Sequence, residues 1–303
     1  MEHGESVLIA GGTGLVGAQL AQRLIQNGYK VLLLSRKKHQ RGNIPVYEWD
    51  VEKGTIDENA VLRANHIINL AGEGIADKAW TPERKKSIIE SRTKSATLLF
   101  DTCKRLHHFP QSYISAAAIG FYGNRGTEIL DEDSTAGEGF LTESCIAWEA
   151  ATQPWIEEGI RTVICRIGIV LSTRGGAMAE TMKPIRFGLA AYFGNGKQYY
   201  SWIHIDDLCG ILQRAIEDEE MQGIYNGVAP NPASNKEFTR TLARVMGRPY
   251  LLLPAPRFIL NTVLGERSHI VLDGAIVSSA KIEQQGYVFQ FPELKAAIQD
   301  LLM

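Results

Sequence analysis

The sequence predicts an α/β fold in which a doubly wound parallel sheet is accompanied by a smaller C-terminal lobe. Three observations support this prediction. Short apolar strands alternate with helices through the first half of the chain, as in parallel sheets with helical crossovers. A glycine-rich turn joins the first strand to the first helix. After residue 171 the alternation ends, and a stretch rich in glycine and aromatic residues begins.

Local signals place each element in turn. Strands are expected, in chain order, at Ser6–Ala10, Tyr29–Ser35, Val46–Trp49, His66–Leu70, Gln111–Ala118 and Thr162–Val170. The run Tyr29–Ser35 is continuously apolar, which is typical of a strand buried on both faces. Helices are expected at Leu15–Asn27, from the Thr81-Pro82-Glu83 start to His107, and around Cys145–Glu158.

The second half gives fewer such signals. Ser201–Leu208 is expected to return to the sheet. Ser234 and Glu237 form a capping box, which predicts a helix that continues to Met246. The last helix is expected over Leu294–Leu302. Between these, 172–200 has no clear period, so we expect it to form part of the C-terminal lobe.

Composition excludes several classes of protein. The net charge of the 303 residues is -2 and no long basic run occurs, which argues against nucleic-acid and membrane partners. The acidic start at Met1–Glu5 does not resemble a secretory signal, and no apolar run is long enough to span a bilayer. The cysteines lack metal-binding spacing. We therefore expect a cytoplasmic protein with buried, reduced thiols and no metal site; the oligomeric state stays open.

The turn between the first strand and the first helix consists of Gly11, Gly12, Thr13, Gly14, Leu15, Val16 and Gly17. In this setting Gly11 permits a tight turn and Gly14 lets the backbone approach a pyrophosphate. Gly17 allows the helix to pack closely on the strand, and the helix N-terminus offers amide groups to the anion. Glycine-rich turns are common, but the flanking strands and helix have the lengths that dinucleotide binding requires. The sequence therefore predicts a dinucleotide site.

The end of the second strand indicates which dinucleotide is bound. Sites for NAD usually carry an acidic residue there, which accepts hydrogen bonds from the ribose hydroxyls. This chain has Ser35 and Arg36 instead, followed by two lysines. A hydroxyl and a guanidinium suit a 2′-phosphate, so we predict NADP(H). The alternative is that these residues form only a solvated basic turn.

Ordered motifs extend the comparison to the whole chain. They occur at Gly11–Gly17, Asn69–Gly72, Ser91-Arg92, Ser115–Gly123, Trp148–Ala151, Arg166–Leu171, Gly175–Met178, Gly194–Gln198, Trp202–Leu208, Asn226–Pro230, Gly286-Tyr287 and Phe291–Leu294. Together they resemble the extended short-chain dehydrogenase/reductases, and more closely an atypical branch called "epimerase family protein". The resemblance implies a Rossmann core that binds NADP(H) and a C-terminal substrate lobe.

The same resemblance implies further cofactor contacts. Leu70 and Ala71 would line the cofactor at the end of the fourth strand, Arg92 would face it from the following helix, and Val170 would contact it beyond the sixth strand. For Leu70, Ala71 and Val170 ordinary core packing is the alternative, and for Arg92 it is a surface position on its helix.

Catalytic residues are harder to place. Typical members of the superfamily use a hydroxyl residue after the fifth strand and a Tyr-x-x-x-Lys helix, in which lysine lowers the tyrosine pKa. Here alanine occupies the hydroxyl position. The helix offers Cys145-x-x-x-Glu149 in one alignment and Phe140-x-x-x-Ser144 in another. The usual roles are therefore not transferred.

Four residues remain as substitutes, each with an alternative role. Tyr122 and Glu149 are weak candidates for a general acid or base. The alternative for Tyr122 is a packing role, and the alternative for Glu149 is an ion pair on the surface of its helix. His204 is expected to bond Asp206 or Asp207, and Cys145 lacks an identifiable cationic neighbour. The Gly194–Gln198 loop and Tyr199–Trp202 are expected to wall the substrate side, although aromatic residues at this density are also common in packing between lobes.

These observations predict a division of the chain and a function. Residues 1–171, with 201–228 returning to them, would form the NADP(H)-binding Rossmann domain, and 172–200 with 229–303 the substrate lobe. The leading hypothesis is an oxidoreductase that acts on an unidentified small carbonyl or hydroxyl substrate. A non-catalytic redox sensor and a nucleotide-sugar epimerase are the alternatives.

Overall fold

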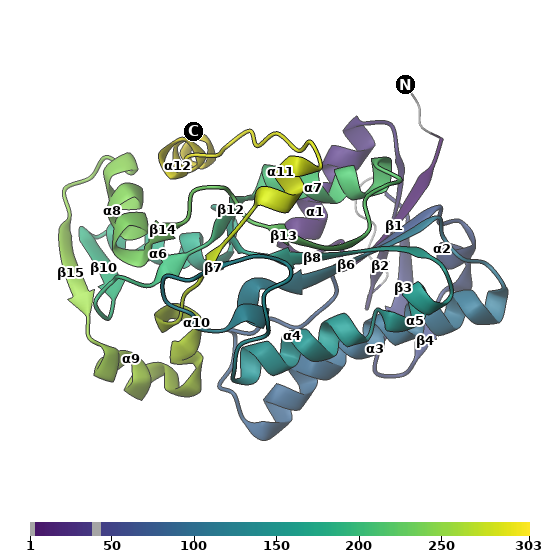
Figure 1. The fold of residues 1–303 in the computed structure, drawn as a ribbon, viewed down its shortest axis with the longest axis horizontal. Helices are drawn as coiled ribbons and strands as arrows, with labels where there is room; N and C mark the ends of the chain where they lie inside the picture. The colour runs from purple at the N-terminus through teal and green to yellow at the C-terminus, as the bar shows by residue number, and fades with distance from the viewer. Residues whose placement is uncertain (1–3, 38–43) are drawn as a thin grey trace.

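The structure is a computed structural model that describes residues 4–37 and 44–303. Within these ranges the central feature is a sheet of eight strands, drawn in Figure 1. Across the sheet the strands are β13 (Gly223–Gly227), β8 (Arg161–Ile167), β6 (Ser112–Ala118), β5 (His66–Asn69), β1 (Ser6–Ala10), β2 (Lys30–Ser35), β3 (Val46–Asp50) and β4 (Thr55–Ile56). All neighbours are parallel except β3 and β4.

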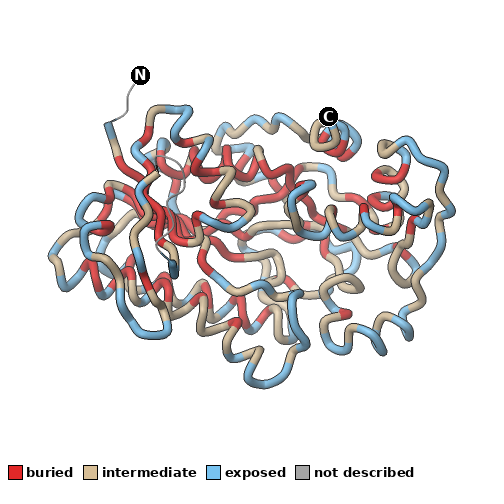
Figure 2. The backbone as a smooth tube through the Cα atoms, turned by 180° about the vertical axis from the view of Figure 1, so that it is seen from behind, coloured by how far each residue is buried: buried red, intermediate tan, exposed pale blue. Residues whose placement is uncertain are grey.

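Helices cover both faces of this sheet, which confirms the predicted doubly wound Rossmann-type fold. One face carries α1 (Leu15–Gln26) and α7 (Ile205–Glu217), and the other carries α2 (Glu58–Leu62), α3 (Pro82–Leu106), α4 (Phe140–Ala150) and α5 (Gln153–Glu157). Buried residues concentrate in the strands between these layers (Figure 2).

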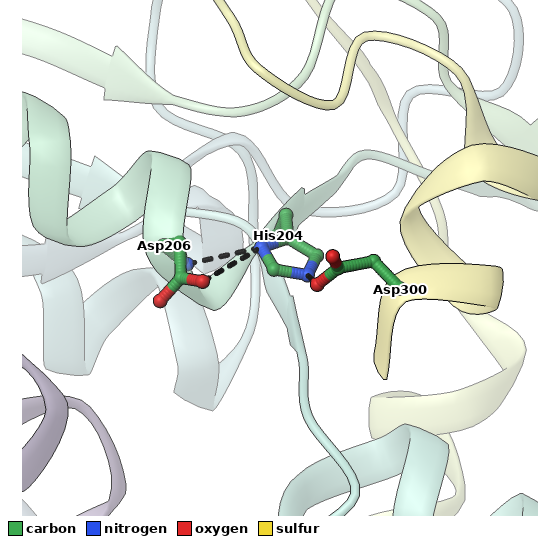
Figure 3. A group of neighbouring side chains, drawn as sticks. All are labelled: His204, Asp206 and Asp300. Atoms are coloured by element: carbon green, nitrogen blue, oxygen red, sulfur yellow. Dashed lines mark hydrogen bonds and ion pairs between the residues drawn. The ribbon is translucent and has the colours of Figure 1, made fainter. Parts of the chain in front are cut away.

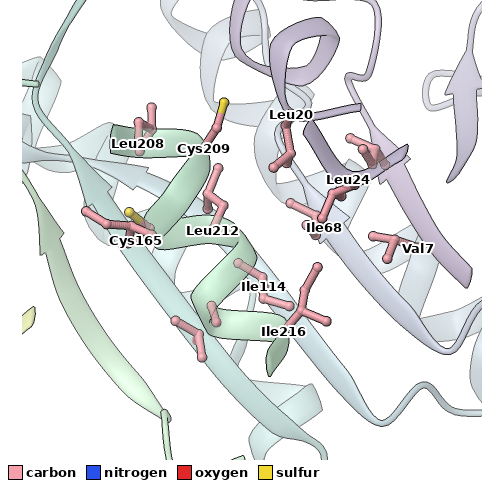
Figure 4. Close-up of a cluster of buried hydrophobic side chains, with 14 of the residues drawn as sticks. Val7, Leu20, Leu24, Ile68, Ile114, Cys165, Leu208, Cys209, Leu212 and Ile216 are labelled. Carbon is pink, nitrogen blue, oxygen red and sulfur yellow. The ribbon is translucent and has the colours of Figure 1, made fainter. Parts of the chain in front are cut away.

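Alternation along the strands explains the two cores. Val31 and Leu33 of β2 pack into the core that α1 and α7 close. Figure 4 shows part of this core, with Leu20 and Leu24 of α1 and Leu212 and Ile216 of α7. Leu32 and Leu34 point the other way, into the core that contains Phe100 of α3. Every residue of the central part of β2 is therefore buried, as its unbroken apolar run predicts.

A third core lies in the C-terminal part of the chain. It forms between α6 (Gly176–Ile185), β10 (Leu189–Phe193), α8 (Asn235–Val245), β15 (Leu251–Ala255) and α12 (Leu294–Leu302). The remaining elements are η1 (Ile119–Tyr122), β7 (Ile129–Leu130), β9 (Ile169–Leu171), β11 (Tyr199–Tyr200), β12 (Trp202–His204), β14 (Ala233–Ser234), α9 (Arg257–Leu264), η2 (Gly265–Ser268), α10 (His269–Leu272), β16 (Ile276–Val277) and α11 (Ala280–Gln284).

Two expected strands differ from the structure. The run Thr162–Val170 is broken at Gly168, where a Cβ would lie 2.4 Å from the carbonyl oxygen of Ser201. The chain leaves the main sheet there, and β9 pairs with β12. The predicted return at Ser201–Leu208 is therefore wrong in part: β12 joins β9, helix α7 starts at Ile205, and β13 is the strand that rejoins the sheet.

One expected helix also differs. The helix around Cys145–Glu158 begins earlier, at Phe140, and it is divided into α4 and α5. Thr152 and Pro154 lie at the division, where proline cannot donate a backbone hydrogen bond.

Two general expectations can be compared with the structure. All four cysteines are free and buried, as the sequence predicts. In residues 4–37 and 44–303, none of the helices combines the length and the apolar character that crossing a bilayer requires.

Candidate functional site

The glycine-rich turn lies at the carboxyl end of β1. Gly11 has φ 78°, and a Cβ there would lie 2.7 Å from the carbonyl oxygen of Leu70. A Cβ on Gly17 would lie 2.4 Å from the carbonyl oxygen of Gly11. Both distances are too short for any side chain, so glycine is required for the turn itself and for the packing of α1.

Helix α1 begins directly after this turn. Gly14 is its N-cap residue, and having no side chain it leaves the first amide groups of the helix uncapped. No acidic residue occurs in the first turn. An anion at this point would meet backbone amide groups and the positive end of the helix dipole, so the residues fit the pyrophosphate of a dinucleotide.

Ser35 and Arg36 follow at the carboxyl end of β2, which pairs with β1. Ser35 is half-buried, and Arg36 and Lys37 are exposed. The Ser35 hydroxyl accepts a long hydrogen bond of 3.4 Å from the backbone N–H of Lys37. Lys38, the second lysine of the sequence motif, lies outside the described residues. Arg36 is thus an exposed cation just beyond the carboxyl end of the strand that neighbours β1.

Asn69, the last residue of β5, determines the shape of the next segment. Its side chain donates to the hydroxyls of Ser95 and Tyr113, each at 3.1 Å, and accepts from the backbone N–H of Ala71 at 3.1 Å. Leu70 donates its N–H to Ala10 at 2.9 Å. Leu70 and Ala71 therefore lie against the glycine turn, next to the carboxyl end of β1.

Arg92 extends from α3 toward the same segment and is 9% exposed, in contrast to the surface position that was its alternative. Its guanidinium donates to the carbonyl oxygen of Glu73 at 3.0 Å and lies over the ring of Trp148 at 4.8 Å. A Cβ on Gly72 would lie 3.1 Å from the guanidinium carbon. Burial lowers the pKa of Arg92, although an arginine remains charged at neutral pH.

Val170 lies near Leu15 of the glycine turn, because both residues approach Gly176. The residue is half-buried in β9. Its carbonyl oxygen lies 3.5 Å from a Cβ built on Gly176, and the side chain of Leu15 lies within 3.9 Å of the same position. The structure therefore gathers the predicted cofactor residues at neighbouring strand ends, where parallel sheets bind their ligands.

Tyr122 is fully buried beyond β6. Its hydroxyl donates to Asn226 at 2.8 Å and accepts from Arg166 at 3.0 Å. Burial raises the pKa of the phenol, and the bond from Arg166 opposes that rise. The hydroxyl is thus engaged in a protein network rather than open to a substrate.

Glu149 faces the same network from α4. Its two carboxylate oxygens accept hydrogen bonds from Arg166 at 2.8 and 2.9 Å. Burial lowers the pKa of Arg166, and its bonds with Glu149 and Tyr122 more than compensate, so that the pKa lies above its usual range. The guanidinium also lies 3.5 Å from the centre of the Phe121 ring. Glu149 thus pairs with a cation from β8.

Cys145 lies one turn before Glu149 and is buried. Burial raises the pKa of its thiol to about 12, and the charge of Glu149 acts in the same direction. Arg92 opposes the effect without cancelling it. The thiol is therefore neutral near pH 7, which is unsuited to nucleophilic chemistry.

His204 lies between two carboxylates at the start of α7 (Figure 3). Its Nδ1 accepts from the backbone N–H of Asp206 at 3.1 Å, and its Nε2 lies 3.3 Å from Asp300 of α12. His204, Asp206 and Asp300 are all potential metal ligands. Figure 3 shows the two carboxylates on opposite sides of the ring, so they do not converge on one nitrogen. The arrangement suits a neutral imidazole that connects α7 to α12.

Other features of the site carry no clear sequence signal. Asn69 belongs to a recognised motif, but its bonds to Ser95 and Tyr113 are tertiary contacts. The stacking of Trp148 on the guanidinium of Arg92 is likewise a tertiary contact, between residues far apart in the sequence. On the substrate side, Gln198 and Tyr200 both donate to the carbonyl oxygen of Val271, at 2.9 and 3.3 Å, so part of the predicted wall is engaged in packing.

Comparisons with known proteins agree with this geometry. Residues 7–226 match the NAD dependent epimerase/dehydratase family, and residues 255–301 match a domain of unknown function, DUF1731. The "Epimerase family protein SDR39U1" of Mus musculus is 36% identical over 300 residues, which cover 98% of this chain and 99% of the relative. "Epimerase family protein YfhF" of Bacillus subtilis is 32% identical, with 98% of each chain covered.

A solved structure gives the same result in three dimensions. The crystal structure of human epimerase family protein SDR39U1 (isoform 2) with NADPH has a TM-score of 0.87 to this chain, at 33% identity and with 98% of both chains covered. The sequence match and the structural match both extend over nearly the full length. The chain therefore belongs to the NAD dependent epimerase/dehydratase family, in the branch called epimerase family protein.

Proposed function

We propose that this protein binds NADP(H) and acts as an oxidoreductase on a small carbonyl or hydroxyl substrate. The observation that carries the proposal is the glycine turn, where a Cβ on Gly11 or Gly17 would collide with backbone at 2.7 or 2.4 Å. Glycines carry no side chain over the start of α1, so its backbone amide groups stay open to a pyrophosphate. The human relative crystallised with NADPH supports the choice of cofactor.

The residues of this chain would divide the binding task. The α1 N-terminus would hold the pyrophosphate, Ser35 and Arg36 the 2′-phosphate, and Leu70, Ala71 and Val170 the apolar sides of the cofactor. Arg92, fixed by Glu73 and Trp148, would orient the nicotinamide end. When bound, the cofactor supplies or accepts a hydride.

We further propose the division of the chain stated above. Residues 1–171 and 201–228 would hold the cofactor, and 172–200 with 229–303 would form the substrate lobe. Most of the third core comes from these lobe segments, which supports the division; Leu171 and Trp202 join it from the other part. The buried, free thiols support a cytoplasmic location.

Two measurements test the proposal. Calorimetric titration should give tighter binding of NADPH than of NADH. Nicotinamide absorbance, followed across a panel of aldehydes and ketones, should then reveal turnover for some members. Tighter binding of NADH would contradict the choice of cofactor, whereas tight NADPH binding with no turnover would contradict only the enzymatic part.

A non-catalytic NADP(H) sensor is the second candidate. It is favoured by the state of the three groups near the expected catalytic position. The hydroxyl of Tyr122 is engaged, Glu149 is paired with Arg166, and the Cys145 thiol is neutral. A sensor requires a partner whose affinity differs between the NADP⁺ and NADPH complexes. Equal affinity of every partner for the two complexes would exclude it.

A further inference from the structure

The C-terminal part of the chain exposes an apolar surface that its own core does not use. Strands β10 and β15 pair so that Leu189 lies beside Leu251. On one side of this pair, Ala190 is buried in the third core. On the other side Leu189, Leu251 and Leu253 are 41%, 61% and 41% exposed. The two-stranded sheet is thus covered on one face only.

Helix α9 extends this surface beyond β15. None of its residues is buried, although most are apolar. Phe258, Ile259 and Val263 are 71%, 44% and 69% exposed, and Phe187, just before β10, is 90% exposed. We call these seven side chains the α9 face: Phe187, Leu189, Leu251, Leu253, Phe258, Ile259 and Val263. At the right of Figure 2 the backbone of β15 and α9 is coloured as exposed or intermediate.

The size of the α9 face calls for a binding partner. Phe187 precedes the start of β10 and Phe258 follows the end of β15, so the two rings lie at opposite ends of the strand pair, with the exposed leucines between them. At roughly 200 Å² each, the two phenylalanines expose on the order of 300 Å² in total. A typical monomer shows about that much in its largest apolar patch. The phenylalanines project from the surface instead of lining a groove, as their exposures of 90% and 71% show. A flat or soft partner therefore fits better than a helix that needs a groove.

Exposed arginines accompany the α9 face: Arg186, Arg248 and Arg257. Residues 181–205 and 238–265, which contain β10, β15 and α9, include no aspartate or glutamate. They contain seven basic residues: Lys183, Arg186, Lys197, Arg240, Arg244, Arg248 and Arg257. Of these, Lys183 pairs with Glu180, and Arg240 and Arg244 belong to α8, which packs on the covered side of the strand pair. Arg248 donates to the carbonyl oxygen of Arg186 at 3.3 Å, which brings these two arginines together beside Phe187. The whole chain is slightly acidic, so this segregation is local.

These charges exclude a second copy as the natural occupant. Paired through this face, two copies would bring arginines against arginines, which costs affinity. An anionic surface has the complementary charge. Projecting aromatic and aliphatic side chains with a basic rim are the composition of elements that lie in the headgroup region of a bilayer.

We propose that the α9 face binds the surface of a bilayer that contains anionic lipid, with Phe187 and Phe258 inserted among the headgroups and the arginines on the lipid phosphates. The net charge of the whole chain, which argues against a membrane partner, averages over this face. The proposal does not depend on cofactor binding or on turnover.

The test is co-sedimentation of the full chain with large vesicles of phosphatidylcholine alone, or with about 30% phosphatidylglycerol. We expect binding to the anionic vesicles only, weakened by added salt because salt screens the arginines. The Phe187→Ser/Phe258→Ser variant should lower the partition coefficient about tenfold or more. Arg248→Gln/Arg257→Gln should lower it by a similar factor.

A matched control separates this effect from general loss of surface apolarity. Ile129 and Val288 are 72% and 83% exposed and lie outside the α9 face. The Ile129→Ser/Val288→Ser variant should bind vesicles as the unmodified protein does. An equal loss of vesicle binding in Ile129→Ser/Val288→Ser and in Phe187→Ser/Phe258→Ser would overturn the proposal. Equal binding of the unmodified protein to neutral and to anionic vesicles would overturn it as well.

Two further outcomes would also overturn it by assigning the face to another occupant. A dimer in light scattering that Phe187→Ser/Phe258→Ser converts to a monomer would make the face a self-interface. Binding of an acidic amphipathic peptide, without binding to vesicles, would indicate a protein partner. Circular dichroism of each variant shows whether it is folded.

Discussion

The carboxylate of Glu149 meets the guanidinium of Arg166 in two hydrogen bonds, of 2.8 and 2.9 Å, where the side chains are 11% and 2% exposed. In one of the two alignments of the Tyr-x-x-x-Lys motif, Glu149 takes the place of the lysine. The pair joins α4 to β8, and through Tyr122 it extends to Asn226 of β13. A polar network that connects α4, β8, η1 and β13 thus engages both candidate acid/base groups, Tyr122 and Glu149.

Removal of either partner from this pair should destabilise the fold. Glu149→Ala leaves a buried guanidinium without its carboxylate, and such changes cost about 3–5 kcal/mol. Urea unfolding should show this loss as a lower midpoint. Glu149→Ala/Arg166→Met should recover part of it, because no charge is left buried. A loss below 1 kcal/mol in the single variant would contradict a structural role for the pair.

The glycine turn leads to a sharper prediction about binding. Gly17→Ala places a methyl group 2.4 Å from the carbonyl oxygen of Gly11, so α1 must move away from β1. We expect NADPH affinity to fall by about 100-fold, which corresponds to roughly 3 kcal/mol. Calorimetric titration measures the change. Gln22→Ala, on the exposed side of α1, serves as the control and should bind NADPH normally.

The fold and the cofactor turn were predictable from sequence because their signals are local. The spacing from Gly11 to Gly17 and the apolar run of β2 depend only on chain neighbours. The break at Gly168 left a weaker local signal, since an isolated glycine inside a strand often marks close backbone approach. Its partner, the carbonyl of Ser201, comes from a distant segment.

The contacts of the candidate catalytic groups were not predictable for the same physical reason. Helical spacing places Glu149 on α4 but does not show which residue of β8 faces it. Likewise the long helix α3 suggests a surface arginine, whereas the packing of Trp148 against it buries Arg92. Sequence alone therefore predicted the glycine turn and the fold around it better than the contacts of the polar groups beside it.

Arg36 should determine the choice between the two dinucleotides. It is an exposed cation just beyond the carboxyl end of β2, where a 2′-phosphate would accept charge-assisted hydrogen bonds. Arg36→Ala should weaken NADPH binding by about 10- to 100-fold, from the roughly 1.5–3 kcal/mol that such bonds contribute. NADH binding should change little. Lys37→Ala, the neighbouring exposed cation, is the control; an equal loss there would indicate a diffuse charge effect instead of a specific contact.

Buried histidines should make stability depend on pH near neutrality. Burial lowers the pKa of His204, and Asp206, Asp300 and Asp207 oppose the shift without cancelling it. Because the folded-state pKa lies below the ordinary value of 6.5, the unfolded chain binds more protons between the two values. The stability contribution is therefore complete above pH 6.5 and is lost as the pH falls toward the folded-state pKa.

Unfolding titrations at a series of pH values test this linkage. The free energy of unfolding should fall below pH 6.5, with a slope of up to about 1.4 kcal/mol per pH unit for each such histidine. Burial lowers the pKa of His66 as well, so two groups contribute. His204→Asn should reduce the slope by one group's share. His107→Asn is the control, since His107 is exposed with φ 50°, a conformation that asparagine accepts. An unchanged slope in His204→Asn would mean that the imidazole between α7 and α12 is already protonated in the folded protein.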